Sequence, residues 1–397
     1  MSAGNEIILV AGVLSLLAVL AGLASARVGT PLLLALIGVG MLAGEDGPGG
    51  IRFEDFQAAY LIGSVSLAII LFQGGLSTHL SMLRKALWPS VALATVGVAI
   101  SAGVVGAAAV VLFGASWPEG LLLGATTAPT DAAAVSVLLR VSRIAVPSRV
   151  VAALEVESGL NDPMSVLLTL ALVGVMTGAG HNGAGGVALL FLEEMGGGAA
   201  LGLAGGLALL RMLRWLQPTS SVRPLLALGG ALALFGGAQM LGASGFLAVY
   251  LAGLVVGNTD HAEGEPIMRF FETFGWLAQN ALFLMLGLLV TPHNLPPLLL
   301  PALAISAILV LLARPLAVAA CLAPFRWSAR EATFVAWAGL RGGVPIFLTI
   351  IPLLEGVSAG QRLFEVVFVV VIVSVAAQGW TAKPLARLLD LRADVPS

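Results

Sequence analysis

Residues 149–178 read RVVAALEVESGLNDPMSVLLTLALVGVMTG, an apolar run that carries Glu155, Glu157 and Asp162 in its first half. The run is long enough to cross a membrane, because a bilayer core about 30 Å thick needs ~20 apolar residues in a helix. Charged side chains at that depth cost several kcal/mol and normally serve a function. The stretch therefore predicts a membrane-spanning helix that holds part of a functional site.

The composition of the whole chain repeats this apolar character. Apolar residues make up 59% of the 397 residues and charged residues 10%, against roughly 45–50% and 25% in soluble domains, which excludes a soluble fold. The net charge is -2 and there is no basic block, so we expect no nucleic-acid partner. Cys321 is the single cysteine and the four histidines lack ligand spacing. We therefore expect neither a disulfide nor a bound cofactor.

Apolar runs separated by polar or Pro/Gly breaks predict an all-α polytopic membrane protein with thirteen transmembrane helices. The predicted ranges are 5–26, 31–43, 57–77, 87–113, 119–139, 149–178, 185–210, 222–242, 244–257, 267–290, 297–322, 330–352 and 363–386. The first run follows Glu6 rather than basic residues and lacks a small-residue cleavage site. We interpret it as a retained helix, not a signal peptide.

The basic residues predict the orientation in the membrane. With the N-terminus outside, the breaks on the cytoplasmic side hold fifteen of the 19 Lys and Arg residues, and the outer breaks hold only Arg52 and Arg362. Because positively charged loops stay in the cytoplasm, the chain is expected in the cell inner membrane with its C-terminus cytoplasmic. Arg314 and Arg341 fall inside predicted helices.

An odd number of helices, with the two termini on opposite sides of the membrane, predicts two inverted six-helix repeats around a linking seventh helix. LFQGGL at 71–76 resembles LFLMLGL at 282–288, and the fifth and twelfth helices both contain helix breakers, PTD at 129–131 and LRGGVP at 340–345. Irregular backbone at that depth survives where protein or a water-filled cavity covers it. Discontinuous helices 5 and 12 therefore point to a transport site, the alternative being prolines that only kink packed helices.

Polar side chains gather on the same helices. Ser158 and Asp162 are four residues apart and share a helix face with Glu155, while Glu157 and Asn161 form a neighbouring stripe. Arg341 keeps its charge and needs a permanent anion. We predict that Glu157 is its partner.

Asp131 and Asp162 then remain to form the site itself. With the Ser158 hydroxyl and the Thr130 carbonyl they offer the oxygen ligands that an alkali cation prefers. Desolvation penalises two negative charges, so either a cation or a proton must neutralise them. Competition between the two predicts cation/proton antiport. The alternative is that both aspartates only bridge helix backbones.

Three stretches, PTD at 129–131, EVESGLNDP at 155–163 and GLRGGVP at 339–345, resemble the bacterial NhaP-type members of the monovalent cation:proton antiporter-1 family, most closely its potassium/proton antiporters. The resemblance implies a transporter rather than an enzyme, with an NhaA-like fold. It implies cation binding by Asp131, Ser158, Asp162 and the Thr130 carbonyl, with Asn161 also in the cation- and proton-binding set, and a structural Glu157–Arg341 ion pair. Asn161 before Asp162 implies electroneutral one-for-one exchange.

The resemblance also implies a homodimer in which a core domain moves against a dimerisation domain. The expected boundaries are 1–86 and 221–292 for dimerisation, 87–180 and 293–397 for the core, and 181–220 for the linking helix. Two features depart from the family. Gln73 stands where relatives carry a carboxylate, and the chain stops about a dozen residues after the last helix, whereas potassium-type relatives continue into cytoplasmic domains.

Several assignments stay open at this stage. Arg314 is expected to extend toward the membrane interface, with neutralisation of Glu155 as the alternative, and Glu155 either attracts cations at the cavity mouth or is an ordinary interfacial residue. An anion or organic-acid symporter of similar fold is the rival function, and an aspartyl protease is a more distant one. Both Na+ and K+ suit an oxygen shell.

Overall fold

The computed structural model describes residues 2–28, 31–131, 146–178, 183–259 and 261–391, and these residues are almost entirely α-helical. The only β interaction among them is an isolated bridge between Gly44 and Ile51. In chain order the helices are α1 (Ser2–Val28), α2 (Leu32–Ala43), α3 (Phe56–Ser77), α4 (Leu80–Ala92), α5 (Val98–Phe113), α6 (Trp117–Thr127), α8 (Ser148–Thr177), α9 (Gly183–Phe191), α10 (Gly197–Leu216), α11 (Arg223–Met240), α12 (Gly245–Gly257), α13 (His261–Leu289), α14 (Leu299–Ile308), α15 (Arg314–Leu322), α16 (Ala329–Trp337), α17 (Gly343–Leu348), α18 (Ile350–Leu354) and α19 (Gly360–Leu388).

Short π-helical turns join several of these segments into longer rods. Leu93–Gly97 links α4 to α5, Leu192–Gly196 links α9 to α10, and Leu309–Ala313 links α14 to α15. A π-turn inserts an extra residue and so rotates the side chains that follow it, frequently at functional sites. The third of these turns immediately precedes Arg314.

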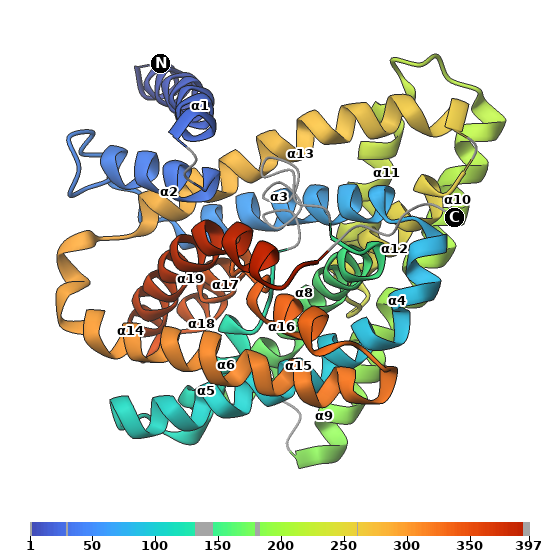
Figure 1. Cartoon of the computed structure of the whole chain (residues 1–397). Helices are drawn as coiled ribbons and strands as arrows, with labels where there is room; N and C mark the ends of the chain where they lie inside the picture. Colours follow the sequence, from blue (N-terminus) through green and yellow to red (C-terminus); the bar gives the residue numbers. More distant parts are fainter. Residues whose placement is uncertain (1, 29–30, 132–145, 179–182, 260, 392–397) are drawn as a thin grey trace.

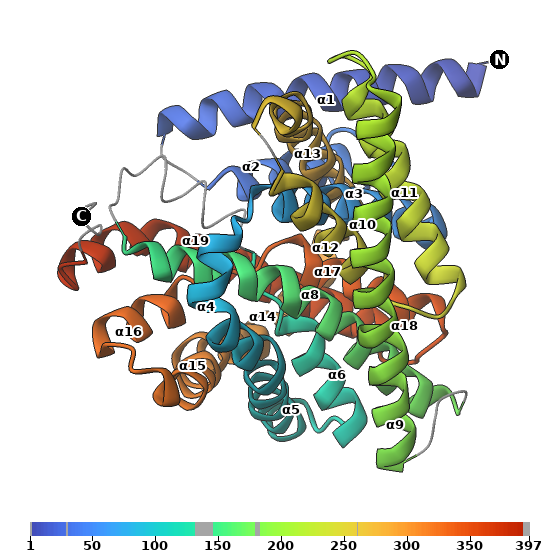
Figure 2. The ribbon, with the colours of Figure 1, turned by 90° about the vertical axis from the view of Figure 1, so that its right-hand side faces the viewer.

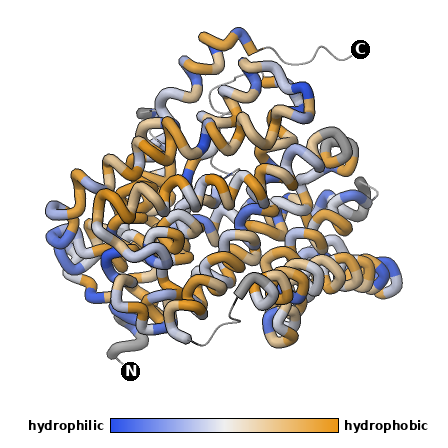
Figure 3. The backbone as a smooth tube through the Cα atoms, turned by 90° about the horizontal axis from the view of Figure 1, so that it is seen from below, coloured by the Kyte–Doolittle hydropathy of each residue, from blue (hydrophilic) through white to orange (hydrophobic). Residues whose placement is uncertain are grey.

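The helices carry the apolar surface that a bilayer requires. Seven helices of the described chain are long and apolar enough to cross a membrane by length and composition. Figure 3 shows apolar residues along most helical turns, with hydrophilic ones mainly at helix ends and in turns. The thirteen-helix count stays a prediction, because α6, α16 and α17 are too short for that criterion. Three predicted boundaries were wrong by several residues, since the predicted helix 87–113 begins at Leu80 with α4, α13 begins at His261 rather than 267, and α10 extends to Leu216 rather than 210.

Two groups of helices pack together (Figures 1 and 2). In the first group α3 contacts α12 and α13, α2 contacts α13, and α10 and α11 contact α12. In the second group α5 contacts α6 and α14, α8 contacts α4 and α6, and α19 contacts α14. Figure 2 shows α10 and α11 along one edge, α15 and α16 toward the opposite one, and α8 between them. Close approach of α3 to α12 depends on Gly75 and Gly253, because a Cβ on either would overlap backbone of the other helix.

The two predicted helix breaks lie against each other. α6 ends at Thr127 and the described chain continues without helix to Asp131, while residues 338–342 separate α16 from α17. The Asp131 amide donates to the Leu340 carbonyl over 2.8 Å, so an N–H of the first break and a C=O of the second satisfy each other's hydrogen bonding. The remainder of the predicted fifth helix, residues 132–139, lies outside the described residues.

The helices that lead into these breaks start in the same way. Ser116 and Glu119 form a capping box at α6, and Ser328 and Glu331 form one at α16. In a capping box the Ser side chain accepts from the third helical N–H and the Glu side chain accepts from the Ser amide. The matched starts are consistent with the predicted relation between the two halves, although the repeat itself stays a prediction.

Candidate functional site

A cavity of about 430 Å³ lies at the junction of α3, α8, α12, α13 and α17. The ionisable side chains of its wall include four carboxylates, from Asp131, Glu155, Asp162 and Glu272. None of the described residues that line it is Lys, Arg or His. Negative groups with no basic counterpart on the wall attract cations and repel anions.

The structure places Asp131 and Asp162 on this one cavity, as the sequence predicted. Asp162 is 6% exposed, and its Oδ1 has no hydrogen-bond partner in the described part of the chain. The Asp131 carboxylate lies directly against Gly342 on the other break, where an added Cβ would overlap its Oδ2. The absence of a side chain at position 342 therefore makes room for the Asp131 carboxylate.

Ser158 lines the cavity, whereas Thr130 and Asn161 are not among its lining residues. The Ser158 hydroxyl donates to the Thr130 carbonyl over 2.6 Å, and the Asn161 amide nitrogen donates to Thr130 Oγ1 over 2.8 Å. These bonds fix the end of α6 against α8 next to Asp131. As cation ligands, the Thr130 carbonyl and Asn161 stay predictions.

The predicted Glu157–Arg341 ion pair was wrong. Glu157 is fully buried and pairs instead with Arg314, whose Nη2 donates to Glu157 Oε2 over 2.8 Å and whose Nη1 contacts Oε1. Arg314 is 3% exposed, so the expectation that it extends toward the interface was wrong as well. The alternative, that Arg314 neutralises a carboxylate, is confirmed with Glu157 in place of Glu155. The physical reason lies in the π-turn before Arg314, which rotates its side chain into the protein.

Arg341 uses backbone acceptors where we expected a carboxylate. It is 1% exposed; its Nη1 donates to the Gly339 carbonyl over 2.9 Å and its amide donates to Ser374 Oγ over 3.0 Å. The unwound segment exposes carbonyls that a continuous helix would have used. Arg314 approaches the same glycine, because a Cβ on Gly339 would lie 2.7 Å from Arg314 Nε. Two buried guanidinium groups therefore flank Gly339.

The wall opposite the aspartates comes from the other helix group. Gln73 of α3 lines the cavity and its amide oxygen occupies the space beside Gly275 of α13. Tyr250 of α12 is 2% exposed, and its ring packs directly on Gly159 of α8. The cavity thus lies between side chains of both groups.

Sequence reasoning missed Tyr250 and Glu272, although both line the cavity. Glu272 is the residue that a search for carboxylates within apolar helices could have found. No group of three or more His, Cys, Asp or Glu side chains in the described chain is close enough to hold a metal ion together. The four carboxylates are therefore spread along the cavity, with Asp131 at a helix break and Asp162 in the middle of α8.

Crossed helix breaks beside a carboxylate-lined cavity define the class of helical membrane proteins that transport cations. Comparison with known proteins agrees. Residues 13–388 match the family described as sodium/hydrogen exchanger, transmembrane. The chain therefore belongs to the sodium/hydrogen exchanger family, whose members are transporters and not enzymes.

Individual relatives resemble the chain over nearly its whole length. It is 45% identical to the K(+)/H(+) antiporter NhaP of Alkalimonas amylolytica over 98% of this chain and 68% of that protein. It is 42% identical to the K(+)/H(+) antiporter NhaP2 of Shewanella oneidensis over 97% and 67%. The sodium proton antiporter MjNhaP1 from Methanocaldococcus jannaschii has a similar structure, with a TM-score of 0.83, 25% identity and coverage of 97% of this chain and 99% of that one.

Proposed function

We propose that this chain exchanges a monovalent cation for a proton across the cell inner membrane. The observation that carries the proposal is the cavity that ends at Asp131 and Asp162 and has no basic residue on its described wall. Relatives at 45% and 42% identity are named K(+)/H(+) antiporters, which favours K+ over Na+ as the preferred cation. The rival function, transport of an anion, would place two negative groups against a negative substrate.

The exchange follows from neutralisation of one buried site. Asp162 and Asp131 face the same space, and moving both negative charges out of water is unfavourable unless something offsets them. A dehydrated K+ or Na+ binds the carboxylate oxygens together with the Ser158 hydroxyl; a proton on a carboxyl group removes the need for the cation. The site can cross the membrane when it holds either a cation or a proton, whereas crossing of the empty, negatively charged site is unfavourable. The Asn161–Asp162 pair supports a one-for-one, electroneutral exchange.

We further assign movement to the boundary between the two helix groups. The group containing α5, α6, α8 and α19 carries both aspartates and forms the proposed core domain. The group containing α2, α3, α12 and α13 forms the proposed dimerisation domain, and α10 belongs to the proposed linking helix. Elevator-type displacement of the first against the second exposes the site alternately. The exposed lining residues Ser77 and Glu272 lie at the end of α3 and in the first half of α13, which we assign to the cytoplasmic side.

Two features support that orientation. The turns at 44–55 and 290–298 lie at the left of Figure 1, while α13 begins at the right. The right-hand end therefore holds a predicted cytoplasmic break and the left-hand end two predicted outer breaks.

The test uses proteoliposomes with an acidic interior and a fluorescent pH indicator. Addition of K+ or Na+ outside is expected to dissipate the gradient with the wild-type protein and with Glu355→Gln, which removes an exposed carboxylate away from the cavity wall. Asp162→Asn is expected to abolish the response. A titration with each cation then determines the preference. Full exchange by Asp162→Asn, or proton leak that needs no cation, would refute the proposal.

A further inference from the structure

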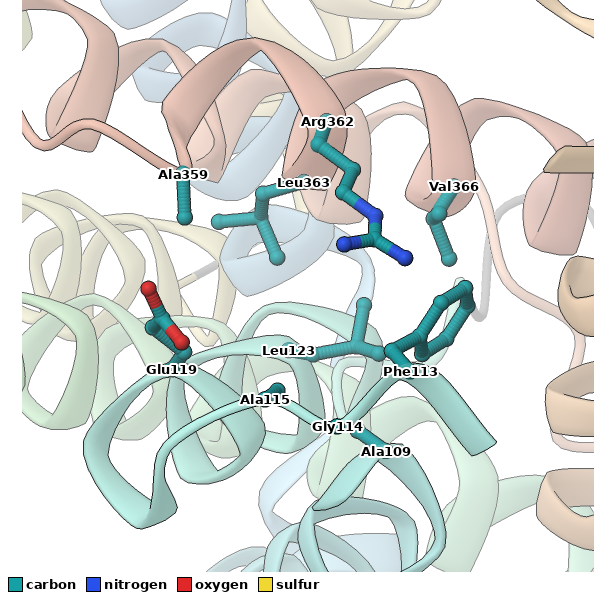
Figure 4. A pocket seen from close by; sticks show the side chains of 10 residues that line it. All are labelled: Ala109, Phe113, Gly114, Ala115, Glu119, Leu123, Ala359, Arg362, Leu363 and Val366. Atoms are coloured by element: carbon teal, nitrogen blue, oxygen red, sulfur yellow. The ribbon is translucent and has the colours of Figure 1, made fainter. Parts of the chain in front are cut away.

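A second pocket, of about 130 Å³, lies between α5, α6 and α19, separate from the acidic cavity. Its wall is largely apolar, and Figure 4 shows two charged side chains at different ends of it. Arg362 points into the pocket beside Phe113, and Glu119 lies at the other end near Ala359. We propose that this pocket binds the headgroup of a membrane phospholipid that carries both a phosphate and a primary ammonium group.

Arg362 supplies the phosphate end of the site. Its guanidinium carbon lies 4.8 Å from the centre of the Phe113 ring, and it forms no ion pair within the described residues. The cation–π contact holds the guanidinium over the pocket but leaves its N–H donors available. A guanidinium in this position suits a phosphate group, which it can bind through two parallel hydrogen bonds.

Glu119 supplies the ammonium end. Its Oε2 accepts the Ser116 amide over 2.8 Å as part of the capping box of α6. A carboxylate has further acceptor sites beyond one such bond. One positive and one negative group on the same wall favour a zwitterion over a simple anion, and a primary ammonium can donate to Glu119 whereas a quaternary one cannot.

The surroundings of the pocket place it at the level of lipid headgroups. Trp117, next to the pocket turn, is 59% exposed, and Val111 near the end of α5 is 82% exposed. Exposed tryptophan is enriched where the bilayer meets water. An exposed apolar residue on the adjacent helix surface is suited to an acyl chain. The room available, 130 Å³, is about four times the volume share of one water molecule.

The occupant is therefore a phosphatidylethanolamine-type lipid, bound by the face of the protein that carries the α5–α6 and α18–α19 turns. A lipid held there joins α6 to α19 within one helix group. This inference depends on the protein being in a membrane and not on the exchange reaction.

The test is the thermal stability of the purified protein in detergent with added lipid, because a ligand that binds only the folded state raises the melting temperature. Phosphatidylethanolamine is expected to raise it for the wild type, and phosphatidylcholine is expected to have little effect. Arg362→Gln should lose most of the shift. Glu119→Gln keeps the capping box, since Gln serves at that position, but should make phosphatidylglycerol as effective as phosphatidylethanolamine.

Arg52→Gln is the matched control, because it removes the other basic residue predicted on this face, which pairs with Glu45; it should retain the full shift. Equal shifts with phosphatidylcholine and phosphatidylethanolamine, or an unchanged shift in Arg362→Gln, would overturn the proposal. An equal shift with soluble phosphoethanolamine would show that a free headgroup, and not a lipid, is the ligand.

Discussion

Replacing Glu157 with methionine is expected to destabilise the protein more than any change at a surface ion pair. The Glu157 side chain is 1% exposed and its partner Arg314 is 4% exposed. Removing one member of a buried pair costs about 3–5 kcal/mol, because the other charge is left without compensation. Here the cost lies at the upper end of that range, since two guanidinium groups flank Gly339 and Glu157 pairs with one of them.

The reverse substitution should cost less. In Arg314→Met the Glu157 carboxylate remains, and Arg341, on the other side of Gly339, is the nearest replacement counter-charge. The double variant Glu157→Met/Arg314→Met removes both charges of the pair and should be more stable than Glu157→Met alone. This order distinguishes charge compensation from a simple loss of packing, which would make the double variant the least stable.

Melting of the purified protein, followed by tryptophan fluorescence, measures the effect. At about 2 °C per kcal/mol, a cost of about 5 kcal/mol means that Glu157→Met is expected to melt about 10 °C below the wild type. Glu265→Gln provides the control, since Glu265 pairs with Arg269 at the surface, where both side chains are more than half exposed; such pairs contribute at most about 1 kcal/mol. The reasoning fails if Glu157→Met melts no lower than that control, or if the double variant melts below both single ones.

Two further predictions concern sites outside that ion pair. Gly342→Ala should abolish cation/proton exchange while leaving folded protein, because the added Cβ would displace the Asp131 carboxylate. The control is Gly74→Ala, since Gly74 lies on the same cavity wall but has open space around it. Exchange by Gly342→Ala at the wild-type rate would contradict the close contact. Asp46 accepts the backbone N–H of His293 over 2.8 Å and also contacts its ring, and these bonds hold the pKa of the carboxyl below its usual value. Because this pKa is lowered, the contact stabilises the fold fully above the ordinary carboxyl pKa, and the stabilisation is lost as the pH falls through the lowered value. The difference in melting temperature between wild type and Asp46→Asn should therefore be present at neutral pH and vanish in acid. A difference that grew in acid would show that the carboxylate is not the stabilising form.

Hydropathy and helix breakers were sufficient to predict the helical class and to place Asp131, Ser158 and Asp162 on one cavity. Pro129 and the glycines after Arg341 interrupt apolar runs, and Asp131, Gly343 and Val344 at these breaks line the cavity. The spacing of Ser158 and Asp162 placed both on one helix face, and both line the same space. These inferences succeeded because they depend on local geometry, namely the helical period and the loss of backbone hydrogen bonds.

The pairing of Glu157 could not be predicted in this way. Arg314 and Arg341 are both arginines inside apolar runs, and the choice between them depends on how α15 is rotated about its own axis. A π-turn at 309–313 sets that rotation, and LVLLA at those positions carries no sequence signal for it. Tyr250 was missed for a similar reason, because an aromatic residue in an apolar helix has no polar neighbour to mark it, and its position on the cavity follows from the packing of α12 on α8.

The contact between Tyr250 and Gly159 has a mechanical consequence. Most packed helices interlock through side chains, and sliding one along the other requires those side chains to disengage. At Gly159 the surface of α8 offers only backbone to the aromatic ring of Tyr250. A shift of α8 along α12 therefore meets no interlocking side chain at this position. Because the ring still excludes solvent there, the same pair of residues keeps the contact closed to water and allows the helices to slide.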